Sequence, residues 1–313
     1  MSGIVSNFEL TILGCNSAIQ AFGRHPTSQV FSAYNQLYLI DCGEGTQFQL
    51  DKFHIKKSRI NQIFISHLHG DHYYGLMGLL SSYRLHGRTE PLQVFCPIGT
   101  KEIVEVNLKH SKGQFVYPIE FYEIEDKPSH KIFEDKYIEV HTIPLNHKIA
   151  TTGFLFVEKP RERNFIKEKI EEHQIPNEAI NLIKEGNDFI GLDGKVIPYT
   201  ELTTAPHPQR KYAYCSDTIY DESILPIIQG VDLLYHEATY LHSEELKAQQ
   251  YWHSTAKQAA TIAMKANAQS LMIGHYSSRY DNLDELLNEA KSVFSNSMLA
   301  IEGRTTEVSP TAP

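Results

Sequence analysis

A run of seven residues, from Ser66 to His72, constrains this chain more than any other feature. It reads Ser-His-Leu-His-Gly-Asp-His and follows an apolar segment, residues 62–66, with the pattern of a short strand. On an extended segment His67 and His69 would point the same way, because side chains alternate. Three imidazoles and a carboxylate this close together suit zinc or a similar metal. The alternative, a solvated histidine-rich loop, fits poorly with the apolar strand and helix that bound the run.

Further ligand-type residues are expected downstream, because the run cannot surround two metals by itself. Three candidates each follow an apolar, strand-like segment: His147, Asp217 and His275. Any one of them alone would more often be a surface or capping residue. Together with the first run they complete two sites, which predicts a two-metal centre where strand ends converge at the edge of a sheet.

The composition is that of an ordinary globular protein. The chain has 313 residues, 41% apolar and 21% charged, enough for one large domain or two modest ones. Its four cysteines are scattered without a CxxC pair, which argues against a structural zinc knuckle or a disulfide framework. No stretch approaches the roughly 18 apolar residues of a membrane helix, and residues 1–7 lack the pattern of a signal peptide. We therefore expect a cytoplasmic protein without membrane contact.

The net charge of −9 counts against a nucleic-acid substrate, because phosphate contacts need a basic surface. Bound divalent metals would add local positive charge that this sum omits. Carboxylates can also lie far from the place where a substrate binds. The charge therefore weakens an RNA assignment without excluding it.

Strands and helices alternate through most of the chain, with one segment of different character. Strands are predicted at 8–14, 30–34, 36–41, 62–66, 92–95, 137–143, 211–215, 231–236 and 270–275, and helices at 74–80, 254–268 and 281–294. Ser254 or Thr255 is the expected N-cap of its helix. Residues 158–208, rich in charge and proline, predict an inserted surface arm of short helices; a solvated loop without a role is the alternative. The tail after Arg304 is expected to be frayed.

Several short words of this sequence resemble ribonuclease Z. They are residues 66–80, Ser216-Asp217-Thr218, His236-Glu237-Ala238-Thr239, His253-Ser254-Thr255 and residues 275–280. The histidine-rich run is shared by many hydrolases and indicates only the metallo-β-lactamase fold. The words His236-Glu237-Ala238-Thr239 and His253-Ser254-Thr255, together with the inserted arm, are far more specific to ribonuclease Z. The resemblance extends from residue 13 to about residue 294.

The resemblance implies an α/β metallo-β-lactamase fold, a four-layer αββα sandwich. Residues 1–313 would form a single domain, and the insertion at about 158–208 would be a flexible arm that binds tRNA as an exosite. Two Zn²⁺ ions per subunit are implied, with Mn²⁺ or another divalent metal as the alternative. One ion would be held by His67, His69 and His147, the second by Asp71, His72 and His275, and Asp217 would bridge both.

The resemblance also implies a reaction and its catalytic residues. Asp71 would accept a proton from the nucleophilic water, His253 would protonate the leaving oxygen, and Glu237 would orient His253. The substrate would be precursor tRNA, whose 3′ trailer is removed to leave a 3′-hydroxyl on the tRNA and a 5′-phosphate on the trailer. Family members commonly form homodimers, so a homodimer is expected.

Two other classes of function remain as alternatives. A thioesterase, lactonase or cyclic-nucleotide phosphodiesterase of the same fold would share the metal ligands but generally lacks the words around Glu237 and His253. A non-enzymatic RNA-binding or scaffold protein would leave the complete ligand set unexplained. The chain also departs from the family at residues 20–28, where only Arg24 fits the loop Pro-x-Lys-x-Arg-Asn, and after Ile175-Pro176, where the usual Gly-Pro element is missing. Discrimination against CCA-ended tRNA is therefore not carried over.

Overall fold

Two seven-stranded β-sheets form the framework of the computed structural model, which describes residues 7–125, 127–206 and 208–310. The first sheet has the strand order β18-β1-β2-β3-β4-β5-β6. Its strands are β1 (Phe8–Gly14), β2 (Ser28–Ala33), β3 (Gln36–Ile40), β4 (Ile60–Phe64), β5 (Leu92–Pro97), β6 (Ile119–Ile124) and β18 (Thr305–Glu307). The second sheet has the order β17-β16-β15-β14-β9-β8-β7. Its strands are β7 (Lys131–Glu134), β8 (Ile138–Leu145), β9 (Thr151–Glu158), β14 (Lys211–Cys215), β15 (Leu233–Glu237), β16 (Ser270–Gly274) and β17 (Ser297–Leu299).

The two sheets pack against each other because their strands bury apolar side chains on both faces. On β3, Tyr38 and Ile40 belong to the central core, which also contains Phe154 and Tyr212 of the second sheet. Leu39 on the same strand points to the other face and packs in a separate apolar cluster with the helices. This alternation is the period of two expected of a strand buried on both sides. The largest core thus lies between the two sheets.

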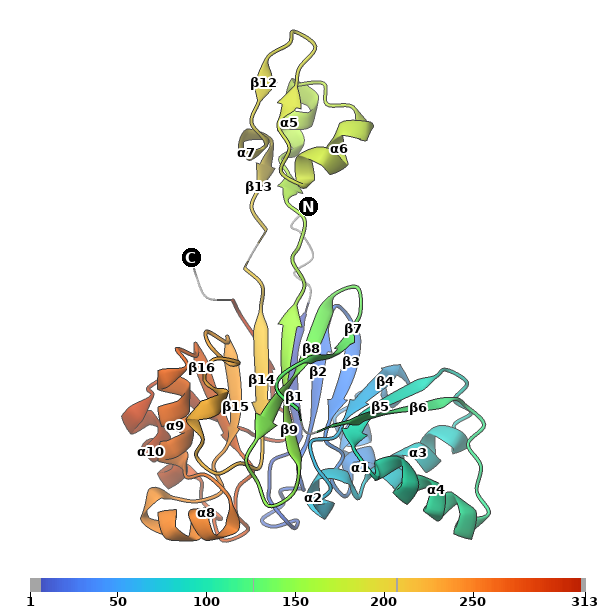
Figure 1. Ribbon diagram of the computed structural model, residues 1–313, viewed down its shortest axis with the longest axis vertical. Coiled ribbons are helices and arrows are strands. Elements are labelled where there is room, and N and C mark those ends of the chain that lie inside the picture. The colour runs from blue at the N-terminus through green and yellow to red at the C-terminus, as the bar shows by residue number, and fades with distance from the viewer. Residues whose placement is uncertain (1–6, 126, 207, 311–313) are drawn as a thin grey trace. The chain divides into compact units, whose positions relative to one another are not determined.

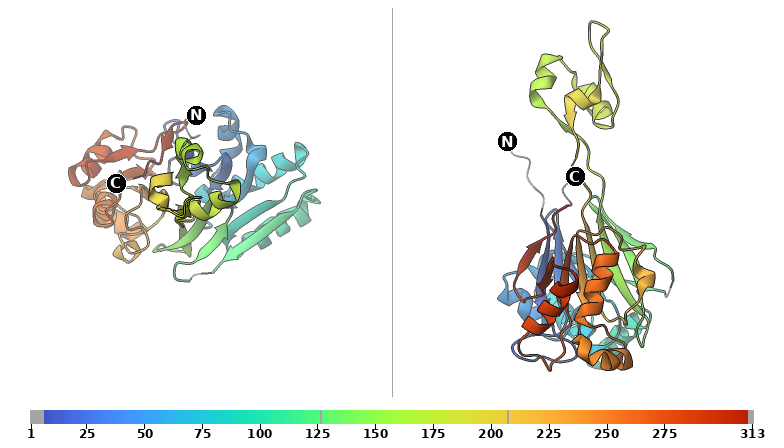
Figure 2. Two further views of the ribbon diagram at one scale, coloured as in Figure 1. Left: turned by 90° about the horizontal axis from the view of Figure 1, so that it is seen from above. Right: turned by 90° about the vertical axis from the view of Figure 1, so that its left-hand side faces the viewer.

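Helices cover the outer face of each sheet (Figures 1 and 2). Apolar residues of α1 (Thr46–Lys52), α3 (Leu76–Leu85) and α4 (Thr100–Ser111) pack on the first sheet. Those of α9 (Ala256–Lys265) and α10 (Asp284–Val293) pack on the second, where small alanines let α9 approach closely. The predicted four-layer αββα sandwich is therefore confirmed. Within the described residues, none of the helices is long and apolar enough to cross a membrane.

Local expectations from the sequence were met at α9 and failed at the C-terminal tail. Thr255 is the N-cap of α9, and it forms a reciprocal capping box with Gln258. The tail after Arg304 was predicted to be frayed, which is wrong for residues 305–307. These residues form β18, an edge strand paired antiparallel with β1. Three residues are too few for a strand pattern to be recognised in the sequence. They adopt a regular strand conformation because they form backbone hydrogen bonds with β1.

The segment Glu158–Gln209 groups into a compact unit of its own. It contains α5 (Lys167–Glu172), α6 (Asn177–Lys184), α7 (Tyr199–Leu202) and two small sheets, β10 (Asn164–Phe165) with β13 (Thr203–Thr204) and β11 (Phe189–Ile190) with β12 (Val196–Ile197). Its own small core consists of Ile175, Ile183, Ile197 and Leu202. Four buried apolar side chains give this unit an independent, though modest, source of stability.

Parallel strands place the ligand-type residues at one edge of each sheet. The strands β14, β15 and β16 run parallel, so their carboxyl ends meet at the same edge. Asp217 follows β14, Glu237 ends β15 and His275 follows β16. In the first sheet, β3 and β4 are also parallel, and they lead to Asp41 and to the histidine-rich run. Polar residues from both sheets therefore converge beyond their strand ends.

Candidate metal centre and active site

Three imidazoles and one carboxylate form the first cluster. Nε2 of His67 and Nε2 of His147 lie 3.0 Å and 3.2 Å from Nδ1 of His69, so three ring nitrogens face a common point. Oδ2 of Asp217 completes the group, at 3.6 Å from His67 and 3.7 Å from His147. These four residues can hold a metal ion. The sequence placed all four among the candidate ligands.

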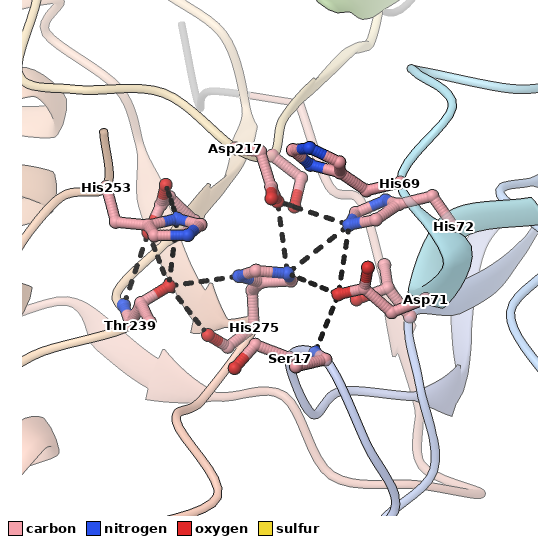
Figure 3. Close-up of polar contacts among 12 residues, drawn as sticks. Ser17, His69, Asp71, His72, Asp217, Thr239, His253 and His275 are labelled. Atoms are coloured by element: carbon pink, nitrogen blue, oxygen red, sulfur yellow. Dashed lines mark hydrogen bonds and ion pairs between the residues drawn. The ribbon is translucent and has the colours of Figure 1, made fainter. Parts of the chain in front are cut away.

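The second cluster lies beside the first and shares Asp217 with it (Figure 3). Nε2 of His72 and Nε2 of His275 are 3.3 Å apart, and Oδ2 of Asp71 lies 3.3 Å from the His275 nitrogen. The other oxygen of Asp217, Oδ1, lies 3.2 Å from His72 and 3.1 Å from His275. The two oxygens of Asp217 thus face different sets of histidines, which is the arrangement of a carboxylate between two cations.

The donor chemistry fits two divalent cations. A neutral imidazole has one N–H and one lone pair, and the second ring nitrogen of His67, His147, His72 and His275 already has a partner outside the clusters. The remaining nitrogens face one another, with lone pairs and carboxylate oxygens in excess of donors. Borderline metals such as zinc bind this mixture of nitrogen and oxygen ligands. The conclusion that these residues can hold divalent cations rests on this set of nitrogen and oxygen donors.

The protonation states agree with that interpretation for most of the cluster. Burial lowers the pKa values of His67, His69 and His147 below the ordinary histidine value, which keeps these rings neutral. Burial acts to lower the pKa of His72. The carboxylates of Asp217, Asp71 and Asp41 outweigh burial and raise that pKa. Three carboxylates around one imidazole favour a positive charge at that place. Neutral imidazoles beside an excess of carboxylates are the state that a metal site requires.

The histidines are oriented by partners on their outer sides. Nδ1 of His72 lies 2.7 Å from Oδ2 of Asp41, and Nδ1 of His147 lies 2.7 Å from the carbonyl oxygen of Trp252. Nδ1 of His275 lies 2.9 Å from the hydroxyl of Thr239. Such contacts fix the ring orientation and raise the basicity of the ligand nitrogen. They select Nε2 as the ligand atom in all three rings.

Asp41 is a functional candidate that the sequence prediction missed. It is fully buried, and its carboxylate accepts hydrogen bonds from the backbone and hydroxyl of Ser66 at 2.7 Å and 2.8 Å. It also accepts the hydroxyl of Tyr214 at 2.6 Å, which ties the first sheet to the second. In the sequence Asp41 only ends a strand-like segment. Its position one residue past β3, parallel to β4, was the available signal.

Three of these residues have a left-handed backbone that is uncommon for anything but glycine. The φ angles are 54° at Asp41, 59° at Asp217 and 57° at His275. Each stands just after a strand, where a sharp change in direction turns the side chain toward the clusters. Backbone strain of this kind costs on the order of 1–3 kcal/mol per residue and persists where the surrounding structure holds it. The fold thus positions all three carboxylate and imidazole groups against a local preference.

His253 lies beside the clusters (Figure 3) and forms a pair with Glu237. Nδ1 of His253 lies 2.8 Å from Oε1 of Glu237, whose side chain is fully buried. Burial acts to lower the pKa of His253, but the Glu237 carboxylate outweighs it and raises the pKa to about 9. The ring is therefore protonated at neutral pH and can donate a proton to a group in the cavity. His236, the residue before Glu237, is also buried, and its Nδ1 lies 2.7 Å from the backbone carbonyl oxygen of Glu237.

Asp71 lies on the opposite side of His275 from His253 (Figure 3). Its Oδ2 accepts the backbone N–H of Ala18 at 2.7 Å as well as facing His275. Burial acts to raise the pKa of Asp71, but His72 and His275 outweigh it and lower the pKa below its ordinary value. Asp71 is therefore an ionised carboxylate. It can accept a hydrogen bond from a water molecule in the cavity.

A cavity of about 620 Å³ joins these groups to the surface. Asp71, His69, His147, Asp217, His253 and His275 line it, so six of the nine predicted site residues reach it. The other three, His67, His72 and Glu237, are buried behind them. The cavity has room for a phosphodiester with parts of its two flanking groups.

Arg24, the one residue that matched the family loop, is engaged within the chain. Its Nε donates to Oδ1 of Asn16 at 3.2 Å, and its terminal nitrogens donate to the carbonyl oxygens of Asp281 at 3.1 Å and of Tyr280. Its guanidinium also lies over the ring of Phe22, 5.3 Å from the centroid. Arg24 therefore holds the loop 20–28 in place through these contacts.

Comparison with known proteins gives matches over both the whole chain and its first half. The chain is 45% identical to ribonuclease Z of Bacteroides fragilis over 298 residues, which cover 95% of this chain and 98% of that protein. It is 46% identical to ribonuclease Z of Porphyromonas gingivalis over 297 residues, covering 94% and 97%. Residues 8–166 also match the family described as Anti-Pycsar protein Apyc1. That match ends before Asp217, Glu237, His253 and His275.

Solved structures agree with the fold. Human tRNase Z, short form, superposes with a TM-score of 0.68 at 26% identity, covering 96% of this chain and 99% of that one. The metallo-β-lactamase fold protein YhfI from Bacillus subtilis gives a TM-score of 0.69 at 16% identity, covering 96% and 99%. The second likeness bears on the fold alone.

Proposed function

The chain belongs to the ribonuclease Z family of endoribonucleases, and we propose that it removes the 3′ trailer from precursor tRNA in a zinc-dependent reaction. The products are a tRNA with a 3′-hydroxyl and a trailer with a 5′-phosphate. The observation that carries the proposal is the Glu237–His253 pair, 2.8 Å apart, in the same cavity as the two metal-type clusters. A site with a nucleophile side and a separate proton donor suits cleavage of a phosphodiester.

Seven residues would hold the two metal ions: His67, His69, His147, Asp71, His72 and His275, with Asp217 between the two clusters. Two such cations would lower the pKa of a water molecule and offset the negative charge of the phosphate. Zn²⁺ is proposed, and Mn²⁺ or another divalent ion is the alternative that the same donors accept.

Side chains of this protein accept and donate the protons of the reaction. Asp71 is ionised and takes the proton from the attacking water at a carboxylate oxygen. His253, protonated at neutral pH, gives the proton on Nε2 to the leaving 3′ oxygen. Glu237 holds Nδ1 of that ring, fixes its orientation and stabilises its charge. The charge on phosphorus-bound oxygens and the charge on His253 are opposite, which favours this placement of the substrate.

The unit Glu158–Gln209 is proposed to be the arm that clamps the body of the tRNA. The candidate cations are Lys159, Arg161, Arg163, Lys167 and Lys169. Some of them already have partners in the unit: Arg163 Nε donates to the hydroxyl of Thr203 at 2.7 Å, and Lys169 pairs with Glu172 at 2.7 Å. Phosphates would compete for these groups, so each contact contributes less than a free cation would. A homodimer acting in the cytoplasm completes the proposal.

Cleavage of a precursor tRNA with a short 3′ trailer, with both product ends mapped, tests the proposal. The wild-type protein should cut just past the discriminator base when Zn²⁺ or Mn²⁺ is supplied. The Asp71→Ala protein should leave the precursor intact. An intact precursor with the wild-type protein, alongside rapid hydrolysis of a small phosphodiester or thioester, would overturn the RNA assignment. It would favour another hydrolase of the same fold.

A further inference from the structure

An exposed aromatic ring and a lysine lie together in the active-site cavity, and neither belongs to the metal clusters or the proton donor pair. The ammonium of Lys148 lies over one face of the Tyr251 ring, 5.0 Å from its centroid, which leaves the opposite face for a stacking partner. Both residues line the cavity that contains His147 and His253. Tyr251 is 43% exposed, which is a large fraction for an aromatic residue beside a buried site.

The backbone around Tyr251 fixes the place of the ring relative to His253. Helix α8 (Glu245–Tyr251) ends there, and Trp252 has a left-handed φ of 63°. The carbonyl oxygen of Trp252 accepts a hydrogen bond from Nδ1 of His147 at 2.7 Å. The backbone N–H of His253 donates a hydrogen bond to the carbonyl oxygen of Ala248 at 2.8 Å. The chain from α8 to His253 is thus tied down on both sides of the ring.

An aromatic face beside a cation is suited to a nucleotide. Unpaired RNA bases stack on tyrosine rings, and this interaction tolerates any base because each has a π face. A lysine next to the ring can contact the phosphate of the same nucleotide.

We propose that Tyr251 and Lys148 form a subsite for the last nucleotide retained on the tRNA, with Tyr251 stacking on its base and Lys148 contacting its phosphate. This inference rests on the proposed function. The side of the cavity follows from the proton donor: the oxygen that His253 protonates is the 3′ oxygen of that nucleotide. Its base must therefore lie near His253, and Tyr251 is the exposed aromatic ring two residues away.

Tyr74 provides a matched comparison in the same cavity. It lies near Asp71, is 66% exposed, and its ring packs against Gly70, where a Cβ would lie 2.3 Å from a ring carbon. It is an exposed tyrosine on the nucleophile side and not beside His253. A base contact made by Tyr251 should therefore be distinguishable from one made by Tyr74.

The test compares two precursors, one intact and one abasic at the last retained nucleotide. On the intact precursor, Tyr251→Ala should lower kcat/KM about 10-fold, whereas Tyr251→Phe should stay close to wild type. On the abasic precursor, Tyr251→Ala and wild type should be equal. Tyr74→Ala should show the same ratio to wild type on both precursors. Lys148→Gln should reduce the slope of log kcat/KM against log salt by about one.

Tyr122→Ala serves as the control for loss of an exposed tyrosine, since Tyr122 is also 43% exposed but lies on β6 outside the cavity. Metal content of each variant, measured by mass spectrometry, reports whether the centre is intact. Equal loss by Tyr251→Ala on both precursors, or no loss on the intact one, would overturn the subsite. If the wild-type protein cuts neither precursor, the proposed function fails first, and the two failures are thereby separate.

Discussion

Glu237 and His253 are joined by a contact of 2.8 Å that leads back to the metal-type clusters through one threonine. The hydroxyl of Thr239 donates to Oε2 of Glu237 at 2.6 Å and lies 2.9 Å from Nδ1 of His275. The backbone N–H of Thr218, next to Asp217, donates to Oε1 of Glu237 at 2.8 Å. The buried carboxylate therefore positions the proposed proton donor and the ligand-type residues together.

Replacing His253 by alanine should separate proton donation from metal binding. Because His253 is not among the seven proposed ligands, His253→Ala should keep both metals and lose about 10²–10⁴-fold in kcat. The measurement is precursor cleavage together with the number of metal ions per chain. A variant that loses metal in step with activity would contradict the assigned role.

The pH dependence of cleavage should report the Glu237–His253 pair. Cleavage needs the protonated ring, and Glu237 outweighs burial to raise the pKa of His253 to about 9, so kcat should fall as pH rises through about 9. Glu237→Gln removes the charge that stabilises the protonated ring, so the alkaline limb should move to lower pH. Glu120→Gln on β6 removes the same charge at a distance and should leave the limb in place. An unchanged limb in Glu237→Gln would exclude His253 as the titrating group.

Asp217 should couple the two metal ions. Its Oδ2 faces His67 and His147, and its Oδ1 faces His72 and His275. Asp217→Ala should therefore lower the binding affinity for both metal ions. His69→Ala removes a ligand from the first cluster only and should weaken mainly one ion. Titration with a metal-sensitive chelator would count the ions in each variant. Retention of one tightly held ion in Asp217→Ala would contradict the shared position.

Asp41 should tune metal affinity without being a ligand. Asp41→Asn replaces the carboxylate that holds Nδ1 of His72, and loss of such an outer partner costs about 10–100-fold in metal affinity. Tyr214→Phe is the matched control, because it removes one hydrogen bond to the same carboxylate but keeps its charge. Chelator competition at constant pH measures both. Equal effects of the two variants would indicate packing and not the charge of Asp41.

Deleting residues 162–200 should weaken precursor tRNA binding and spare a small phosphodiester. The unit Glu158–Gln209 has its own core, so the sheets should survive its shortening. We expect KM for precursor tRNA to rise about 10–100-fold through lost phosphate contacts, with hydrolysis of bis(p-nitrophenyl) phosphate unchanged. An equal loss on both substrates would refute the proposed clamp.

The ligand-type residues and the fold that brings them together could be predicted from short stretches of the sequence. The run from His67 to His72 is local, and His147, Asp217 and His275 stand directly after apolar strands whose pattern is legible in short windows. The N-cap at Thr255 was legible for the same reason, since a capping box spans only four residues. Local periodicity and capping depend on near neighbours in the chain.

The contacts that hold these residues in place could be seen only in the folded chain. Asp41 and Tyr214 meet although they are 173 residues apart. Lys148, between β8 and β9, lies against Tyr251 at the end of α8. The same holds for β18, which is ordered by β1. None of these contacts leaves a pattern in the sequence, because each joins segments that are distant in the chain and that meet only when the whole chain folds. The split of the two Asp217 oxygens between two clusters has the same origin.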